Sequence, residues 1–324
     1  MVRALAPMLA VAGRPPDVPG LWSIEMKWDG MRAIARSGRD CRLSSRTGRD
    51  ITATFPEVAA TLDELSRGRE LIIDGEIVAP DPASGSPHFG RLQQRMHVRR
   101  PSAVLMRAVP TQYFAFDLLS VDGRLITALP YSERRRRLED AALSAAAVQT
   151  PPSWADVDAA TMLELAREHQ LEGIVSKLAA SPYRPGIRSP TWVKTPLRRA
   201  ADVIVAGWLP GRGRFSTLFG SLILAGYDGE GRLVHIGNVG TGWTMRASRA
   251  LQARLDELAR DTDPFDLPPQ GWSTRHAQWV EPRIVGLVEY REVTAEGLRH
   301  PSWRGVRPDK PPREVTVPAN VPLG

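Results

Sequence analysis

The sequence predicts a mixed α+β domain followed by a small β-barrel, and three features of the chain carry this prediction. Short segments that alternate apolar and polar residues recur in the first part of the chain, with stretches of helical periodicity between them. Pro196, Arg198 and Arg199 then mark a change of texture and a linker. The remaining sequence reads as short strands with one inserted helix, a pattern that suits a Greek-key barrel.

Local signals predict the elements of the first part. We expect strands over residues 21–46 (in short antiparallel pieces), 71–78, 113–119 and 173–177. Thr54 is expected to cap a helix, because Pro56 suits its first turn and Val58, Leu62 and Leu65 fall on one face. Further helices are expected from Ser132, where four arginines follow one another at 134–137, and over residues 158–170.

The second part has a strong hairpin signal. Asp228-Gly229-Glu230-Gly231 separates two expected strands at residues 221–227 and 232–239. One amphipathic helix over residues 244–260 and strands at 284–293 complete the set. These elements suit a barrel of the OB type, so the predicted domains are residues 1–197 and 198–324.

Composition narrows the class of protein. The 324 residues carry a formal charge of +7 and a pI near 10, which favours a polyanionic partner such as nucleic acid. No apolar run approaches the roughly 18 residues of a membrane span, and no signal peptide is evident at the start. The single cysteine, Cys41, excludes an internal disulfide and a cysteine metal cluster. We therefore expect a cytoplasmic protein with no membrane partner.

Lysine is rare in this chain, and its few positions direct attention to a site. Of the 43 basic side chains only four are lysine, namely Lys27, Lys177, Lys194 and Lys310. A bias of a GC-rich genome toward arginine explains the scarcity but not the survivors. A lysine can lose its proton or act as a compact point charge, which a guanidinium cannot.

The segment around Lys27 has the residue types of a nucleophilic site. At a period of two, Glu25, Lys27 and Asp29 share one face of an extended segment, and Gly30 lets the chain turn. A lysine amine is a nucleophile only when deprotonated. The alternative for this segment alone is a surface strand of mixed charge.

Two glutamates beside glycines are candidate metal ligands. Glu76 and Glu172 each lie next to a glycine on an expected strand and could hold Mg²⁺, with phosphate oxygens completing the shell. Either glutamate alone is more simply a solvated residue at a strand edge. Their occurrence together with the lysines favours the site.

Seven phrases in a fixed order carry a family resemblance: KWDGMR, SRTG, DGEIV, FAFDLL, EGIVSK, WVK and a terminal RPDK. In this order they resemble the motifs of the covalent nucleotidyltransferase superfamily of DNA ligases, RNA ligases and mRNA capping enzymes. Within it, the sequence is similar to bacterial ATP-dependent DNA ligases, including the ligase module of bacterial end-joining enzymes. The resemblance implies a nucleotidyltransferase (adenylation) domain of antiparallel sheets with flanking helices, followed by an OB-fold domain.

The resemblance also implies a chemistry, in which Lys27 attacks the α-phosphate of ATP, releases pyrophosphate and carries AMP. Asp29 would position the metal, Mg²⁺ or Mn²⁺, or the incoming 3′-hydroxyl. Implied contacts to the nucleotide are Glu25 near the adenine, Phe116 stacked on it, Arg32 and Arg46 at the ribose and phosphate or at the nick, Glu76 and Glu172 at the ribose or the metal, and Lys177 and Lys194 at the α-phosphate. Arg307, Asp309 and Lys310 would close over ATP and orient the pyrophosphate, with residues 196–199 as a mobile linker.

The sequence departs from the family pattern at one position. The family phrase usually carries two lysines one residue apart, but here Lys194 is followed by Thr195 and Pro196. Arg198 or Arg199 could supply the missing charge, or it is dispensable.

The implied polymer is nicked double-stranded DNA, held mainly through its phosphates. Arg46, Arg212 and Arg214 are the preferred contacts, and the last two fall in a glycine-rich loop. Other candidates are Arg91, Arg95, Arg99, Arg100 and the run of arginines at 134–137. For this run, a solvated helix face is the alternative. The resemblance suggests a monomer acting in DNA repair at the nucleoid, allows a Ku-type end-joining partner, and gives no reason to expect a domain before Lys27 that encircles DNA.

Two other functions are also compatible with the sequence. An RNA ligase or a capping-type nucleotidyltransferase would share the lysine chemistry. A non-catalytic nucleic-acid-binding protein built on an OB barrel would share the high pI and the strands of the second part.

Overall fold

A computed structural model describes residues 5–16, 18, 20–38, 40–211, 218–267, 276–294 and 297–318. The chain forms two compact units, residues 1–197 (unit 1) and 198–324 (unit 2). Each unit is a mixture of antiparallel sheets and a few helices, which confirms the predicted α+β class.

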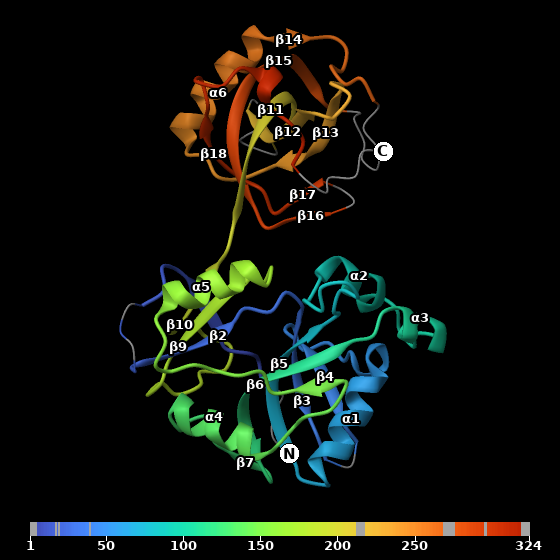
Figure 1. The fold of residues 1–324 in the computed structure, drawn as a ribbon, viewed down its shortest axis with the longest axis vertical. Coiled ribbons are helices and arrows are strands. Elements are labelled where there is room, and N and C mark those ends of the chain that lie inside the picture. Colours follow the sequence, from blue (N-terminus) through green and yellow to red (C-terminus); the bar gives the residue numbers. More distant parts are fainter. Residues whose placement is uncertain are drawn as a thin grey trace. The chain divides into compact units, whose positions relative to one another are not determined.

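The described residues of unit 1 form two sheets and five α-helices, whose arrangement is drawn in Figure 1. Its strands are β1 (Leu9–Ala12), β2 (Trp22–Met26), β3 (Met31–Arg36), β4 (Arg42–Ser45), β5 (Leu71–Val78), β6 (Gln112–Val121), β7 (Arg124–Leu125), β8 (Val148–Gln149), β9 (Gly173–Leu178) and β10 (Arg188–Pro196). Its helices are the 3₁₀-helix η1 (Thr52–Thr54) and α1 (Pro56–Ser66), α2 (Phe89–Met96), α3 (Ala103–Ala108), α4 (Tyr131–Asp140) and α5 (Ala159–Glu168).

The two sheets of unit 1 bring together strands that lie far apart in the sequence. Sheet I has the order β1-β10-β9-β2, and sheet II has the order β4-β3-β5-β6-β7 with β8 beside β6. All pairs are antiparallel except β1 with β10 and β6 with β8. The pairing of β1 with β10 places the start of the unit beside its last strand.

Three buried clusters define the layers of unit 1. Sheet I packs Ile24, Met26 and Ile174 against Met162 and Ala166 of α5. One face of sheet II packs against α1 and parts of α2 and α4. The other face contributes to a third cluster with residues of sheet I and its flanks: Met8, Ile34, Ile72, Phe116, Leu119, Tyr183 and Trp192. The order of layers is therefore helix, sheet I, sheet II and helices.

Unit 2 is a barrel-like set of strands with one long helix (Figure 1). Its elements are β11 (Arg199–Pro210), β12 (Phe219–Tyr227), β13 (Leu233–Val239), α6 (Met245–Glu257), β14 (Ala259–Arg260), β15 (Gln278–Tyr290), β16 (Glu292–Thr294), β17 (Gly297–Arg299), β18 (Ser302–Val306) and the 3₁₀-helix η3 (Pro312–Glu314). The main sheet has the order β13-β12-β11-β15-β14, β18 pairs with β15, and β16 pairs with β17. Leu251 and Leu255 of α6 enter the core beneath this sheet.

The predicted hairpin of unit 2 forms between β12 and β13. The Asp228 carboxylate accepts hydrogen bonds from the backbone N–H groups of Glu230 and Arg232, both at 2.9 Å. The Asp228 N–H donates to the Arg232 carbonyl at 3.0 Å, which closes the loop. The helix expected over residues 244–260 is α6, and Thr244 caps it by accepting from the N–H of Ala247.

The prediction for the cap of α1 is wrong. The helix begins at Pro56 with Phe55 as its N-cap, and Thr54 belongs to η1. Phe55 is fully buried, so its packing sets the start of the helix without a side-chain cap. Val58 and Leu62 are buried as predicted, and Leu65 packs against the same core.

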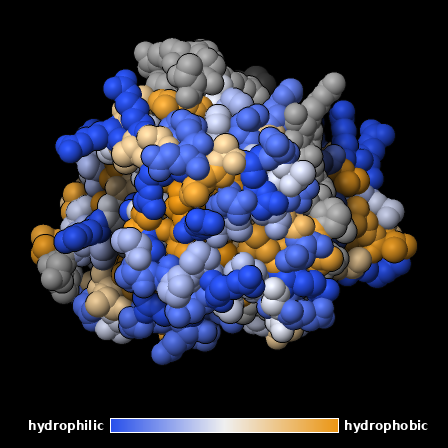
Figure 2. All heavy atoms as spheres, turned by 90° about the horizontal axis from the view of Figure 1, so that it is seen from above, coloured by the Kyte–Doolittle hydropathy of each residue, from blue (hydrophilic) through white to orange (hydrophobic). Residues whose placement is uncertain are grey.

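The surface is mainly polar. Within the described residues no helix is long and apolar enough to cross a membrane. Large apolar side chains are exposed at separate positions, such as Val104 and Leu21. On the face drawn in Figure 2, hydrophilic side chains predominate, with apolar ones visible between them.

Candidate functional site

A pocket of about 210 Å³ lies between the two sheets of unit 1. Sheet I supplies residues of β1, β2, β9 and β10 to its walls, and sheet II supplies residues of β3, β5 and β6. The lining residues are Leu9, Ala10, Glu25, Met26, Lys27, Trp28, Arg32, Arg46, Glu76, Phe116, Val175, Lys177, Arg188, Trp192 and Lys194. The lining of the pocket therefore combines aromatic side chains with several cationic side chains.

Lys27 follows the last residue of β2 and is held there by backbone contacts. Its N–H donates to the Gly173 carbonyl at 2.8 Å, and its amine forms an ion pair with the Glu172 carboxylate. Gly173 has a φ of +133°, and a Cβ atom there would lie 2.2 Å from the Thr195 carbonyl oxygen. Only glycine fits that backbone, which is how the phrase EG brings Glu172 to the lysine.

A second glycine brings sheet II close to the lysine. A Cβ atom at Gly30 would lie 2.2 Å from the Ile77 carbonyl oxygen and 2.9 Å from Cγ of Glu76. The turn after Lys27 therefore rests directly on the end of β5, where Glu76 lines the pocket.

Glu76 is the carboxyl group of the pocket whose ionisation is most altered. Its pKa is raised to about 8, mainly by burial and further by Glu172 and Asp74, while Arg32 and Lys27 oppose the shift. The cations present therefore compensate its charge only in part. A divalent cation would supply the missing charge, so Glu76 and Glu172 fit a metal whose shell phosphate oxygens complete. Among the described residues no three such side chains form a ready-made metal cluster.

Arg32 is held by Asp74, a fully buried carboxylate of β5. Asp74 accepts two hydrogen bonds from the Arg32 guanidinium, both at 2.6 Å, and a third from the Tyr183 hydroxyl at 2.6 Å. That hydroxyl accepts in turn from the N–H of Met8 at 2.8 Å. Burial opposes the charge on Arg32, but the Asp74 carboxylate outweighs it and raises the pKa of Arg32 above its usual value. The guanidinium lies 4.5 Å from the centre of the Phe116 ring.

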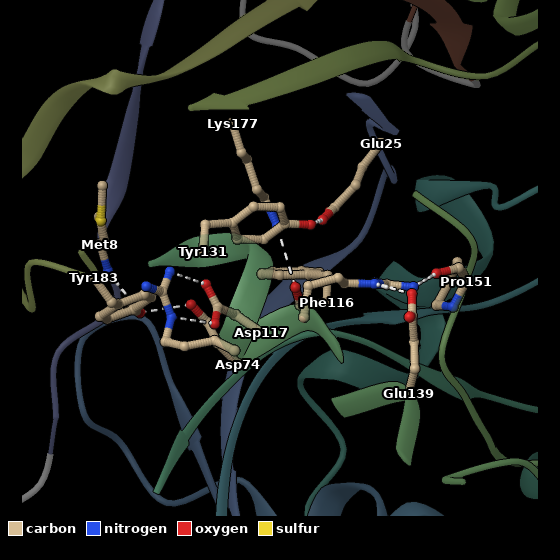
Figure 3. Close-up of polar contacts among 12 residues, drawn as sticks. Met8, Glu25, Asp74, Phe116, Asp117, Tyr131, Glu139, Pro151, Lys177 and Tyr183 are labelled. Carbon is tan, nitrogen blue, oxygen red and sulfur yellow. Dashed lines mark hydrogen bonds and ion pairs between the residues drawn. The ribbon is translucent and has the colours of Figure 1, made fainter. Parts of the chain in front are cut away.

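Lys177 is buried at the aromatic end of the pocket. Its amine donates to the Glu25 carboxylate at 2.7 Å, and the Tyr131 hydroxyl donates to the same oxygen (Figure 3). The amine also lies 4.4 Å from the centre of the Trp192 ring and 4.5 Å from that of Phe116. Burial lowers the pKa of Lys177, and the Glu25 carboxylate opposes this shift. A buried pair of this kind is costly to break, because one charge is left uncompensated.

The ion pair of Arg32 with Asp74 has a second ion pair beside it on sheet II, formed by Asp117 and Arg134. Asp117 of β6 is directly opposite Asp74 of β5, and two like charges in that position repel. Each carboxylate has its own arginine: Asp117 accepts from Arg134 at 2.8 and 2.9 Å. Figure 3 shows Asp74 and Asp117 side by side. The FAFDLL phrase therefore carries a residue that holds α4 against sheet II.

The structure gathers most of the predicted site residues in unit 1. Glu25, Lys27, Arg32, Arg46, Glu76, Phe116, Lys177 and Lys194 line the pocket. Glu172 contacts Lys27 from the edge of this lining, and Asp29 lies in the turn that follows β2, outside the lining. Arg307 and Lys310 belong to unit 2, where both contact Asp202. Arg212 and Arg214 lie outside the described residues.

Three arginines predicted as possible DNA contacts are instead internal. Arg95 is fully buried, bound to Glu57 at 2.9 Å and to the Thr54 and Val109 carbonyls. Arg134 is bound to Asp117, and Arg135 donates to Glu139 at 2.8 Å and to the Pro151 carbonyl. The expectation is wrong because each of these residues lies on the buried face of its helix, Arg95 on α2 and the other two on α4. Four consecutive arginines on a helix necessarily include its buried face.

Sequence reasoning missed several residues that hold the site together. Asp74, Tyr131 and Tyr183 position the groups that line the pocket, and Asp202 contacts the two cations of the RPDK phrase. Asp74 could have been found, because it lies two residues before Glu76 on a strand and so shares its face. No local signal identifies Tyr131 or Asp202, whose partners are more than 100 residues away.

A lysine amine and two carboxylates in a pocket between antiparallel sheets, followed by an OB-type barrel, define the nucleotidyltransferase class. Comparison with known families makes the assignment narrower. Residues 7–195 match the model of the ATP dependent DNA ligase domain, and residues 215–310 match that of the ATP dependent DNA ligase C terminal region. The chain therefore belongs to the ATP-dependent DNA ligase family, which confirms the predicted resemblance and the two predicted fold types.

Relatives in the same family carry names that refer to DNA ligation. The chain is 38% identical over 317 residues to the multifunctional non-homologous end joining DNA repair protein LigD of Mycobacterium tuberculosis, covering 96% of this chain and 39% of that protein. It is 32% identical to a DNA ligase of Natronomonas pharaonis, covering 97% of this chain and 57% of the relative. The chain thus spans about two fifths of the LigD proteins.

Solved structures agree with the family. The ligase domain of M. tuberculosis LigD is similar with a TM-score of 0.56 and 36% identity, covering 97% of this chain and 98% of that one. A structure from work on Lig E DNA ligases has a TM-score of 0.61 at 18% identity, a likeness of fold alone. The family matches leave the RNA-ligase, capping and non-catalytic alternatives without support.

Proposed function

We propose that this chain seals nicks in double-stranded DNA through a lysyl-AMP intermediate on Lys27. The observation that supports this most directly is the position of the Lys27 amine. It lines one pocket with Arg32, Glu76 and Lys194 and is ion-paired with Glu172. A similar structure, that of a mycobacterial DNA ligase D at 36% identity, is a complex with ATP, which supports ATP as the nucleotide.

In the first step the Lys27 nitrogen forms a bond to the α-phosphorus of ATP, and the bond from that phosphorus to pyrophosphate breaks. The amine must lose a proton, and Glu172 is the carboxylate in contact with it. AMP then passes to the 5′-phosphate of the nick, and attack by the 3′-hydroxyl joins the strands and releases AMP. Asp29 would position the metal or that hydroxyl.

The cationic side chains would divide the nucleotide between them. Lys194 and Arg32 reach the pocket from opposite sheets, which suits phosphate oxygens that gain charge in the transition state. Lys177 is buried against Glu25 and the aromatic rings, so its contacts favour a place beside the adenine over the α-phosphate. Phe116 would stack on that base and Arg46 would contact the ribose or the nick.

A divalent metal, Mg²⁺ or Mn²⁺, would be held by Glu76 and Glu172 and would supply charge to the reacting phosphate. Arg307 and Lys310 would orient the leaving pyrophosphate. Arg212 and Arg214 remain candidate DNA contacts by sequence alone.

The biological setting is proposed from the relatives. The LigD names refer to non-homologous end joining, so repair of broken DNA at the nucleoid, with a Ku-type partner, is the favoured role. We propose that the chain acts as a monomer on a nick.

Substitution of Lys27 by arginine tests the nucleophile. The guanidinium keeps the charge beside Glu172 but does not deprotonate at ordinary pH. We expect no mass increase of AMP after incubation with ATP and Mg²⁺, while nicked DNA is still bound. An adduct on the arginine variant would identify another nucleophile.

Two parallel measurements test nucleotide and polymer. The wild-type protein is incubated with ATP or GTP, and the modified peptide is identified by mass spectrometry. Nicked DNA and nicked RNA are then compared as substrates. A GTP-only adduct, or sealing of RNA alone, would contradict the proposal.

A further inference from the structure

The two basic residues of the RPDK phrase share one carboxylate within unit 2. Asp202 of β11 accepts from Lys310 Nζ at 2.7 Å through one oxygen and from the Arg307 guanidinium at 3.0 Å through the other. The three residues are joined although Asp202 lies more than 100 positions before the cations. Asp202 has only 17% of its side chain exposed, so its charge is poorly screened.

The turn that carries the two cations is anchored to the sheet. The N–H of Arg307 donates to the Val285 carbonyl of β15 at 2.8 Å, and the N–H of Lys310 donates to the Arg307 carbonyl at 3.3 Å. Asp309 binds the other side of the Arg307 guanidinium at 2.9 and 2.8 Å, and this contact lowers the pKa of Asp309 to about 2. The backbone hydrogen bonds therefore fix the position of this turn, and the two carboxylates fix the orientation of the Arg307 and Lys310 side chains.

The cluster is electrically neutral, because two cations face two carboxylates. Lys310 and Arg307 have more donors than these carboxylates can use, and their side chains are 27% and 37% exposed. A polyphosphate can use the remaining donors directly, but it competes with Asp202 for the donors that this carboxylate already holds and for the positive charge that it compensates.

We propose that Asp202 is a positioning residue that competes with pyrophosphate for Lys310 and Arg307 and so keeps the affinity for this product low. This inference rests on the proposed role of Lys310 at the pyrophosphate. When pyrophosphate departs, the Asp202 carboxylate takes up the donors that it leaves, and the reverse attack of pyrophosphate on the lysyl-AMP becomes less favourable.

The test is the reverse reaction of the preformed adenylate. The full chain carrying AMP is mixed with inorganic pyrophosphate and Mg²⁺, and ATP formation is followed against pyrophosphate concentration. In Asp202→Asn the competing charge is gone, so half-saturation should fall about two- to five-fold, the range for a partly exposed ion pair. An unchanged or raised half-saturation concentration would overturn the inference, since a merely structural role would weaken binding.

Glu289→Gln is the matched control. Glu289 lies on the neighbouring strand β15 and pairs with Arg304 at 2.6 Å, so the variant loses the same charge without touching Lys310. It should leave half-saturation unchanged, and an equal fall in both variants would attribute the effect to net charge and contradict the inference. Asp202→Ser repeats the test, and failure of both Asp202 variants to fold would make Asp202 a structural residue instead.

Lys310→Gln separates this inference from the proposed function. If it leaves the pyrophosphate dependence unchanged, the role of Lys310 itself fails. If it weakens pyrophosphate binding while Asp202→Asn does not strengthen it, only the role of Asp202 fails. In the double variant the effect of Asp202→Asn should largely vanish, because the two residues act through one contact.

Discussion

Glu76 is the residue at which burial most alters the chemistry of the pocket. In the unfolded chain a glutamate loses its proton near its ordinary pKa of 4.5, whereas folded Glu76 has a pKa of about 8. Between these values the folded state holds more protons than the unfolded state. Its contribution to the free energy of unfolding therefore falls as the pH rises through this window.

We expect Glu76→Gln to reduce that dependence. The wild-type protein should lose more stability than the variant between pH 5 and about 8, measured as the urea midpoint at each pH. Glu64→Gln, an exposed glutamate on α1, is the control and should behave like the wild type. Mg²⁺ should lessen the loss in the wild type and in Glu64→Gln but not in Glu76→Gln, and equal slopes in all three proteins would contradict the shift.

At this scale the sequence predicted the pocket-lining residues better than their partners. Three of the four lysines line the pocket. They could be found from the sequence because lysine is rare in this chain and each one lies in a motif phrase. Glu25 and Tyr131 could not be predicted as partners of Lys177, because they reach it only through the pairing of β2 with β9 and the packing of α4. Asp74 meets Arg32 through the pairing of β3 with β5, and its one signal in the sequence is the face of β5 that it shares with Glu76. Long-range pairing of buried charges leaves no periodic signal.

At the scale of elements, Gly173 governs how β9 meets β10. Its φ of +133° is strained for any residue with a Cβ, and the added atom would lie 2.2 Å from the Thr195 carbonyl oxygen. Glu172 directly precedes Gly173 in the chain, and the N–H of Lys27 donates to the Gly173 carbonyl. A shift of β9 would therefore move both the backbone carbonyl and the carboxylate that hold Lys27.

Gly173→Ala should lower the free energy of unfolding of unit 1 by about 3 kcal/mol or more, because strain and collision add. Gly68→Ala is the control: Gly68 also has a positive φ, of +79°, but a Cβ there meets nothing within 4 Å. It should cost only about 1 kcal/mol in urea unfolding. Similar losses in the two variants would show that the close contact with Thr195 is unimportant.

Elements with strong local signals were predicted well. The strand expected at 71–78 is β5, and the helix expected at 158–170 is α5, which Asp158 caps. Thr54 was misassigned because η1 and the buried Phe55 occupy the position of an ordinary cap. The order of strands within each sheet depends on contacts between distant segments, and the sequence alone did not contain it.

At the scale of the whole molecule, the excess of positive charge should govern the encounter with DNA. The formal charge is +7, carried almost entirely by arginine. If six or more phosphates are contacted, affinity for nicked duplex should fall by about 10³-fold or more between 50 and 200 mM salt.

Fluorescence anisotropy of a labelled nicked duplex over that salt range measures this dependence. A matched intact duplex is the control and should show a similar slope, since phosphate contacts carry little sequence or nick information. A flat response to salt would contradict a phosphate-based interface.

The pairing of β1 with β10 also has a consequence for biosynthesis. The pocket takes Leu9 and Ala10 from one end of unit 1 and Trp192 and Lys194 from the other. Such contacts have the longest sequence separation that the unit allows, and they form late because loop closure must precede them. A nascent chain on the ribosome therefore has no complete nucleotide pocket until its strand at residues 188–196 has emerged, so adenylation can begin only after unit 1 is entire.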